Sequence, residues 1–302
     1  MKKLNLQEID TVFISYDEPN AEKNYAELVK IIPWAKRVHG VKGSDAAHKA
    51  AANLSDTYRF VTVDADNIVD PKFFQQKLDI SGAKEHFVFS WCGRNAVNGL
   101  VYGNGGLKCW TKDFVLNMKT HENADPNDTE SVVEFCFDPR YYQMNDCFSV
   151  SHINGSPFQA WRAGFREGVK MSLDRGARAE DIKKVWWQNY QRLLIWANIG
   201  ADTINGLWAM YGTRLGCYMT NCTDWDYVNV RDFEYLTNFW KEKIQSTIAD
   251  GDIEKETVII GKKLKDYLDI EIADLDANAS AFFKKVYQNT PRTYTNMISK
   301  NV

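Results

Sequence analysis

Residues 58–67 read YRFVTVDADN, and this stretch decides the fold. Apolar and β-branched residues lead into two acids, Asp64 and Asp66, which are separated by one small residue. An apolar run of this length is typical of a buried strand in a parallel sheet, so we expect the acids at or just beyond its carboxyl end. Two carboxylates so close together repel each other unless a cation lies between them, and Mn²⁺ and Mg²⁺ prefer such oxygen ligands. The pattern predicts a metal site, with a simple strand end as the alternative.

The segments around this stretch alternate between strand and helix patterns, as in a βαβ sheet. Ligands of such sheets gather beyond the carboxyl ends of the strands, which is where Asp64 and Asp66 are expected. The expected strands are 11–16, 34–41 and 86–91, and the expected helices are 21–32, 44–54 with Ser44 as its cap, and a helix over 71–80 opened by Pro71.

The second half of the chain has a mixed pattern. Strand-like segments at 132–137 and 147–153 precede a helical stretch over 157–215, and 231–302 reads as a helical extension. The predicted fold class is therefore α/β, a Rossmann-type βαβ sheet with a mixed second half and a helical C-terminal extension. We divide it into a catalytic domain, 1–230, with halves 1–110 and 111–230, and the extension 231–302.

Composition limits the class of protein. The chain has 302 residues, of which 44% are hydrophobic, and a formal net charge of −3, so it has no global attraction to nucleic acid or anionic lipid. Its six cysteines form no CxxC pair, which favours reduced thiols over a zinc site or a disulfide scaffold. No apolar run is long enough to span a membrane, and we expect a cytoplasmic protein.

Three segments taken together resemble a known family: VFISYDEPN, then HKAAANLSDTY, then RFVTVDADN. Their order is similar to the N-terminal half of the GT-A fold glycosyltransferases, family 2-like enzymes with a DxD motif. The resemblance implies a nucleotide-sugar donor and Mn²⁺ or Mg²⁺, with Asp66 as the main metal ligand and Asp64 on the metal or the ribose. It places Ser15 and Asp17 near the nucleoside. The likeness extends over roughly 11–110.

The glycine-rich segment YGNGGLKCW (102–110) resembles the part of these enzymes that lines the donor-sugar pocket. Glycine allows close backbone approach and positive φ, so the N–H groups of Gly105 and Gly106 could face sugar hydroxyls. An ordinary tight turn is the alternative.

Candidates for a catalytic base and for a third metal ligand lie further along the chain. The segment GADTINGLWAMYGTRLG (200–216) resembles the family's acid followed by a helix, which places Asp202 as the base; a helix cap is the alternative. The acid that usually precedes it is replaced by Ala201. His152, at the end of CFSVSHI, corresponds to a third metal ligand in several GT-A families, with a structural histidine as the alternative. Either stereochemical outcome, inversion or retention, remains open.

The acceptor is suggested by the segment 159–192, which has eight basic and four acidic side chains, a net charge of +4. Aromatic residues are interleaved with the basic ones, a combination that suits phosphates and bases of nucleic acid. A helix pair with a solvated charged face is the alternative. Such a patch on a short GT-A enzyme is similar to phage-type transferases that glycosylate hydroxymethylated bases in DNA. That resemblance implies a DNA acceptor at Arg162, Arg166 and Trp161, in a host cytoplasm.

Other functions share parts of this pattern. Phosphatases of the haloacid-dehalogenase type also place DxD after an apolar strand, but Ile68 stands where they have Thr or Val. Nucleotidyltransferases have a Gly-rich, Arg-Lys loop that VFISYDEPN lacks. A glycosyltransferase acting on a saccharide or lipid acceptor, and a non-catalytic sugar or nucleic-acid binding module, are further alternatives.

Overall fold

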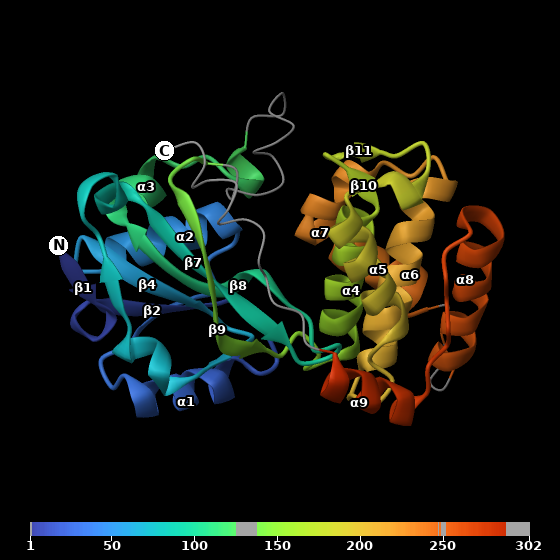
Figure 1. Cartoon of the computed structure of the whole chain (residues 1–302), viewed down its shortest axis with the longest axis horizontal. Coiled ribbons are helices and arrows are strands. Elements are labelled where there is room, and N and C mark those ends of the chain that lie inside the picture. The colour runs from blue at the N-terminus through green and yellow to red at the C-terminus, as the bar shows by residue number, and fades with distance from the viewer. Residues whose placement is uncertain (1, 125–137, 247, 249–251, 288–302) are drawn as a thin grey trace. The chain divides into compact units, whose positions relative to one another are not determined.

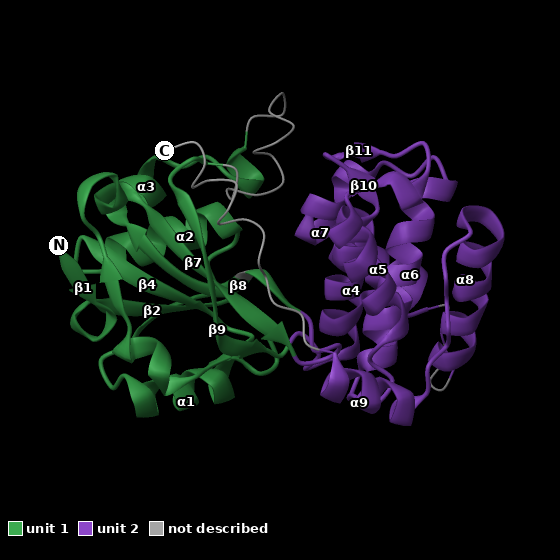
Figure 2. Ribbon diagram, viewed as in Figure 1, with its two compact units in different colours: residues 1–95, 101–152, 289–302 green, residues 96–100, 153–288 purple. Residues whose placement is uncertain are grey.

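The computed structural model describes residues 2–124, 138–246, 248 and 252–287, which belong to two compact units (Figure 2). The first unit contains the described residues up to 95 and those of 101–152, and the second contains 96–100 and the described residues of 153–287. The units therefore divide after residue 152, whereas the sequence suggested divisions after 110 and 230. The assignment of donor and acceptor roles to parts of the chain stays a prediction.

The first unit is built on a seven-stranded mixed sheet with the order β3-β2-β4-β8-β7-β9-β5 (Figure 1). Strand β2 is parallel to β3 and β4, as expected, and β7 is parallel to β9. Strand β8 runs antiparallel to both of its neighbours, β4 and β7, so β4 is not flanked by parallel strands on both sides. The strands are β2 (Asp10–Ser15), β3 (Lys36–His39), β4 (Arg59–Asp64), β5 (Asn67–Val69), β7 (Val88–Asn95), β8 (Val101–Thr111) and β9 (Tyr141–Ser151).

Helices cover both faces of this sheet. Successive strand residues point to opposite sides, so the apolar side chains of one strand pack against helices on both faces. On one face Phe13 and Val61 pack with Leu28 of α1 (Ala21–Ile31). On the other, Val12 and Phe60 pack with α2 (Ser44–Leu54) and α3 (Lys112–Asn117). These two layers confirm the predicted α/β class and fix β4 in the middle of the unit.

Two local predictions are wrong. Residues 71–80 form only a short 3-10 helix, Pro71–Gln75, followed by β6 (Lys77–Asp79), which pairs with β1 (Lys3–Asn5). Burial of Phe73 and Phe74 in the core outweighs the helical pattern there. Ser44 is not the cap of α2: Gly43 precedes the helix with φ +97°, and the Glu122 carboxylate accepts from the Ala46 N–H at 3.0 Å instead.

The second unit is helical, as predicted, in its described residues. Its helices are α4 (Pro157–Met171), α5 (Trp187–Asn198), α6 (Gly206–Cys222), α7 (Phe233–Phe239), α8 (Ile253–Leu268) and α9 (Ala277–Val286), and Leu173–Asp174 and Ala177–Arg178 form a small hairpin, β10 and β11. A π-helical turn, Trp240–Ile244, follows α7. The predicted strand 132–137 and residues 288–302 of the extension lie outside the described residues.

Helices α4 and α6 pack at close range through glycines. A Cβ added at Gly164 or Gly168 would lie 2.0 or 2.1 Å from a backbone oxygen of α6, and one at Gly212 or Gly216 would lie 2.3 Å from a backbone oxygen of α4. Arg214, which is fully buried, donates from α6 to the carbonyls of Ala197 and Thr257. Close backbone contact and the buried guanidinium thus add to the apolar core of the unit, which includes Trp161, Phe165 and Leu236.

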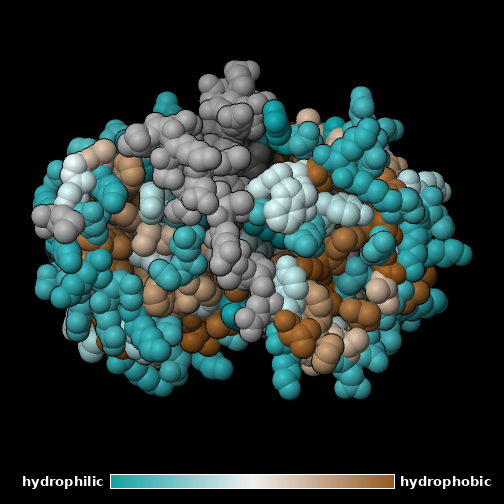
Figure 3. Space-filling model, in the orientation of Figure 1, coloured by the Kyte–Doolittle hydropathy of each residue, from teal (hydrophilic) through white to brown (hydrophobic). Residues whose placement is uncertain are grey.

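Hydrophobic residues also reach the surface, among the hydrophilic ones that dominate the face seen in Figure 3. Tyr267 of α8 and Phe282 of α9 are 69% and 66% exposed. None of the described helices is both long and apolar enough for a membrane span. The five described cysteines are free thiols, in agreement with the sequence, and Cys136 is outside the described residues.

Candidate functional site

The two acids lie where strand β4 ends and turns into β5. Asp64 is the last residue of β4, and the turn through Ala65 and Asp66 is fixed by two hydrogen bonds. Asn24 of α1 donates to the Ala65 carbonyl at 2.8 Å, and the backbone N–H of His152 donates to the Asp66 carbonyl at 2.7 Å. Contacts from α1 and β9 therefore hold the turn in one conformation.

Both oxygens of the Asp66 carboxylate accept hydrogen bonds. Asn67 donates from Nδ2 to Oδ1 at 2.6 Å, and the Ser151 hydroxyl donates to Oδ2 at 2.9 Å. Burial and the nearby Asp64 carboxylate nevertheless raise the pKa of Asp66 to about 6, and Glu18 adds to the effect. Ionising Asp66 next to Asp64 is therefore unfavourable, and a cation bound between the two carboxylates would relieve this repulsion.

The oxygen atoms of Asp66 and of two asparagines near this turn are of the kind that binds a hard divalent cation. The Oδ1 atoms of Asn67 and Asn20 are buried without a hydrogen-bond donor among the described residues. A hydrogen bond from the Nδ2 atom fixes the orientation of each side-chain amide. Asn67 donates to Asp66, and Asn20 donates to the His152 carbonyl at 3.0 Å. Oxygen atoms of carboxylates and amides are the ligands that Mn²⁺, Mg²⁺ and Ca²⁺ prefer. The residues present therefore fit a cation held at Asp64 and Asp66.

His152 lies beside this turn through its backbone. Burial and the Lys23 ammonium lower the pKa of its imidazole, which keeps the neutral form that a metal ligand needs. Within the described residues, however, no three or more His, Cys, Asp or Glu side chains form a group that could hold a metal. The structure therefore does not bring Asp64, Asp66 and His152 together as a ready ligand set, and the role of His152 stays a prediction.

Ser15 is the last residue of β2, the parallel neighbour of β4, and Asp17 follows two residues later. Ser15 is 3% exposed, and its hydroxyl accepts from Arg37 Nε at 2.9 Å and lies 3.0 Å from His39 Nδ1. Asp17 is exposed, and no described residue shares a hydrogen bond or ion pair with its carboxylate. Of the two predicted nucleoside contacts, Asp17 is the one whose side chain is available to a ligand.

The glycine-rich segment is part of β8, and its glycines have a packing role. A Cβ on Gly105 would lie 2.0 Å from the backbone nitrogen of Gly93 in β7, where the pairing of β7 and β8 shifts register. Gly106 has φ +81°, and a Cβ there would lie 2.3 Å from Nδ2 of Asn67. Glycine is thus required at position 105 by close backbone packing and at position 106 by the positive φ together with the nearby Asn67 side chain. Their contact with a donor sugar stays a prediction.

Asp202 belongs to the second unit, in the turn before α6. It is not the cap of that helix, because Asn205 occupies the cap position with φ +57°. Its carboxylate instead forms an ion pair with Lys284 of α9 at 2.7 Å, with 17% of its side chain exposed. The sequence left two roles open for Asp202, helix cap and catalytic base. The structure excludes the cap, and the role of base stays a prediction.

The residues predicted for a DNA acceptor differ in accessibility. Trp161 is fully buried, stacked on Phe239 and packed against Phe165, so the prediction that it stacks on a base is wrong. An amphipathic pattern shows that α4 has an apolar face but not how deeply it is covered. Arg162 and Arg166 are half-buried, and both lie over the ring of Phe233, at 5.3 and 4.8 Å.

Sequence reasoning missed Asn67 and Ser151, which donate hydrogen bonds to Asp66, and Glu18, whose charge adds to the rise in its pKa. It also missed Asn20, which donates to the carbonyl of His152. Asn67 directly follows the DxD motif and could have been noted as a polar residue in an apolar strand. Ser151 could not, since it reaches Asp66 from a strand 85 positions further along the chain.

Comparisons with known proteins give little further information. No protein-family model matches the chain, and no curated protein matches it. Among solved structures, the chain is similar to the glycosyltransferase GlyE of Streptococcus pneumoniae TIGR4, with 16% sequence identity and a TM-score of 0.28. That match covers 46% of this chain and 45% of GlyE, less than half of either. The function must be argued from the site itself.

Proposed function

We propose that the chain is a metal-dependent glycosyltransferase that moves a sugar from a nucleotide-sugar donor to a hydroxyl acceptor. The observation that carries the proposal is the placement of Asp64 and Asp66 at the end of β4, with the Asp66 carboxylate held by hydrogen bonds from Asn67 and Ser151. The pKa of Asp66, raised to about 6 by burial and by Asp64, agrees with this reading. Perturbed pKa values cluster at functional sites, and a cation between two neighbouring carboxylates would relieve their repulsion. The position beyond the carboxyl end of a sheet strand supports a nucleotide ligand.

In this proposal Asp64 and Asp66 hold Mn²⁺ or Mg²⁺, with His152 as a further ligand. The cation, when bound, neutralises the diphosphate and so stabilises the charge that develops on the leaving group. Asp17 and Ser15 contact the nucleoside, and the backbone of Gly105 and Gly106 faces the sugar. Asn24 keeps the turn rigid, so that the carboxylates are held in place before the donor arrives.

We propose Asp202 as the base that takes the proton of the acceptor hydroxyl. Its carboxylate is partly exposed, which permits access, and Lys284 is its ion-pair partner. To receive a proton, Asp202 must release or share this ion pair, so acceptor binding and separation from Lys284 would be coupled.

For the acceptor we keep a hydroxymethylated base in phage DNA as the specific proposal. With Trp161 buried, the exposed aromatic residue between the two arginines is Phe233, which is 40% exposed. Arginines beside an exposed ring can contact phosphates while the ring stacks on a base. A saccharide or lipid acceptor is the alternative.

A donor panel tests the proposal. Purified protein is incubated with UDP-, GDP- and CMP-sugars in Mn²⁺ or in EDTA, and release of nucleotide is measured. We expect slow, Mn²⁺-dependent hydrolysis of one donor, lost in Asp66→Asn and retained in the exposed control Asp146→Asn. General hydrolysis of p-nitrophenyl phosphate without donor turnover would favour the phosphatase alternative.

A gel-shift series tests the acceptor with modified and unmodified duplexes at several salt concentrations. Replacing Arg162 and Arg166 with alanine should weaken binding and reduce its salt dependence, since fewer counterions are released. The pair Lys255→Ala and Lys262→Ala removes the same charge from exposed positions of α8 and is the control. No binding of any duplex or single strand at low salt would contradict the DNA proposal and leave the donor proposal intact.

A further inference from the structure

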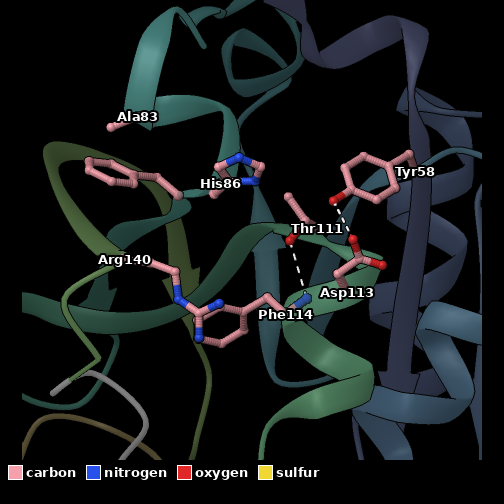
Figure 4. A pocket seen from close by; sticks show the side chains of 8 residues that line it. Tyr58, Ala83, His86, Thr111, Asp113, Phe114 and Arg140 are labelled. Carbon is pink, nitrogen blue, oxygen red and sulfur yellow. Dashed lines mark hydrogen bonds between the residues drawn. The ribbon is translucent and has the colours of Figure 1, made fainter.

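A cavity of about 500 Å³ lies in the first unit, and Figure 4 shows the side chains that line it. It is found where β4, β7 and β9 begin and β8 ends, whereas Asp64 is at the other end of β4. The six residues of β4 separate the two ends by roughly 17 Å at about 3.3 Å per residue. The cavity is lined by Tyr58, Ala83, His86, Phe87, Thr111, Asp113, Phe114 and Arg140.

The wall that carries His86 and Phe87 is held by a buried arginine. Arg59, 5% exposed, donates to the carbonyl of Phe87 at 2.9 Å and to those of Lys84 and Glu85 at 3.1 and 2.5 Å. The ring of Phe87 is stacked on Tyr142. This side of the cavity is therefore fixed before any ligand binds.

The facing wall is also preorganised. The guanidinium carbon of Arg140 lies 4.6 Å from the centre of the Phe114 ring, and two hydrogen bonds to Asp138, at 3.0 and 2.8 Å, hold it there. Beside it the Tyr58 hydroxyl donates to Asp113 Oδ2 at 2.8 Å. Figure 4 shows the guanidinium of Arg140 next to the Phe114 ring, and Tyr58 beside Asp113, to which it is hydrogen-bonded.

These walls define the chemistry of a ligand. The aromatic rings of Phe87 and Phe114 and the guanidinium of Arg140, all of which line the cavity, favour a planar ring as the ligand. Asp113 can accept hydrogen bonds, while Arg140 and His86 can donate them. The charge of Arg140 is balanced by Asp138 and Asp113 adds a negative charge, so a phosphate or carboxylate gains little. A neutral planar ring that both donates and accepts, as a nucleobase does, meets each of these conditions.

We propose that this cavity is a second binding site, specific for a neutral nucleobase, either of a free nucleoside or of a base in a single strand. It is independent of the donor site at Asp64 and Asp66, because it lies at the opposite end of β4. The base would lie between Phe87 and the Arg140–Phe114 pair, with an amino group directed to Asp113.

Ligand-observed NMR with the full chain tests the site, using adenosine, guanosine, cytidine and thymidine without metal. We expect at least one nucleoside to bind with a Kd on the order of 1 mM or tighter. Ala83→Trp fills the cavity from an exposed position and should weaken binding by about tenfold or more, while Ala83→Ser is the matched control and should not. Asp113→Asn should change which nucleoside is preferred, because it replaces a pure acceptor with a group that also donates.

A short single-stranded oligonucleotide distinguishes the two sources of the base. Competition with the bound nucleoside would identify a base in a strand as the ligand, and absence of competition would identify the free nucleoside. The proposal is overturned if no nucleoside binds, if Ala83→Trp leaves binding unchanged, if Asp66→Asn abolishes it, or if L-tyrosine binds and the nucleosides do not.

Discussion

Replacing Asp66 with asparagine should make the metal-free protein more stable at neutral pH while removing its function. The pKa of Asp66 is raised from 3.8 to about 6 by burial and by Asp64, so the folded protein holds this proton more tightly than the unfolded chain does. The difference of about 2 pKa units, at about 1.4 kcal/mol each, corresponds to about 3 kcal/mol. Because Asp66 is partly exposed, we expect solvent to reduce the gain to about 1 to 2 kcal/mol.

The sign of the pH dependence follows from the same shift. Between pH 4 and pH 6 the folded state binds more protons at Asp66 than the unfolded state does, so this group favours folding at low pH and the benefit is lost as the pH rises through about 6. Asparagine keeps the shape and can still accept from Asn67, but it has no charge. The advantage of Asp66→Asn should therefore be present at pH 7.5 and absent near pH 4.

The assay is urea unfolding in EDTA at the two pH values, with Asp146→Asn as the control for an exposed carboxylate. Adding Mn²⁺ should then stabilise the unmodified protein and not the variant, since only a state that binds the ion is stabilised by it. A lower stability of Asp66→Asn than of the unmodified protein at pH 7.5 in EDTA would refute the claim that the Asp66 charge destabilises the metal-free protein.

Three further predictions concern other residues. Asp202→Asn should lower kcat by about 10²–10⁴ with donor binding preserved if Asp202 is the base, and should leave the cap of α6 unaffected, because Asn205 occupies it; a normal rate would remove Asp202 from the mechanism. Gly105→Ala should destabilise the first unit by about 2 kcal/mol or more in urea unfolding, since its Cβ would lie 2.0 Å from a backbone nitrogen of β7, and an unchanged midpoint would contradict that packing. Trp161→Ala should cost about 3–5 kcal/mol of stability, as for a core aromatic residue, whereas weaker DNA binding at unchanged stability would show that Trp161 is a surface contact after all.

The sequence was sufficient for the elements whose signal is local. The apolar run before Asp64 predicted β4 and the position of the acids, because side-chain burial on both faces of a central strand leaves an uninterrupted pattern. Helix α2 was found at its observed bounds from its alanine-rich pattern. The antiparallel insertion of β8 beside β4 could not be found this way, since strand direction depends on the path of the whole chain.

The site could be predicted only in part for the same reason. Asp64 and Asp66 belong to one short segment, whereas the Ser151 hydroxyl and the Asn24 amide reach the turn from β9 and α1. The fate of Trp161 depended on α7 and the π-helical turn that cover it, and nothing in α4 itself reveals them. Tertiary contacts of this kind decide which polar groups are available to a ligand.

The central claim is that Asp64 and Asp66 bind a nucleotide through a divalent cation. Calorimetric titration with UDP, GDP and CMP, in Mn²⁺ and in EDTA, tests it most directly, with Asp66→Asn measured alongside. The account predicts that one nucleotide binds in Mn²⁺, and that its binding is lost in EDTA and in the variant. Binding of equal strength with and without the ion, or no binding of any of the three nucleotides, would contradict it.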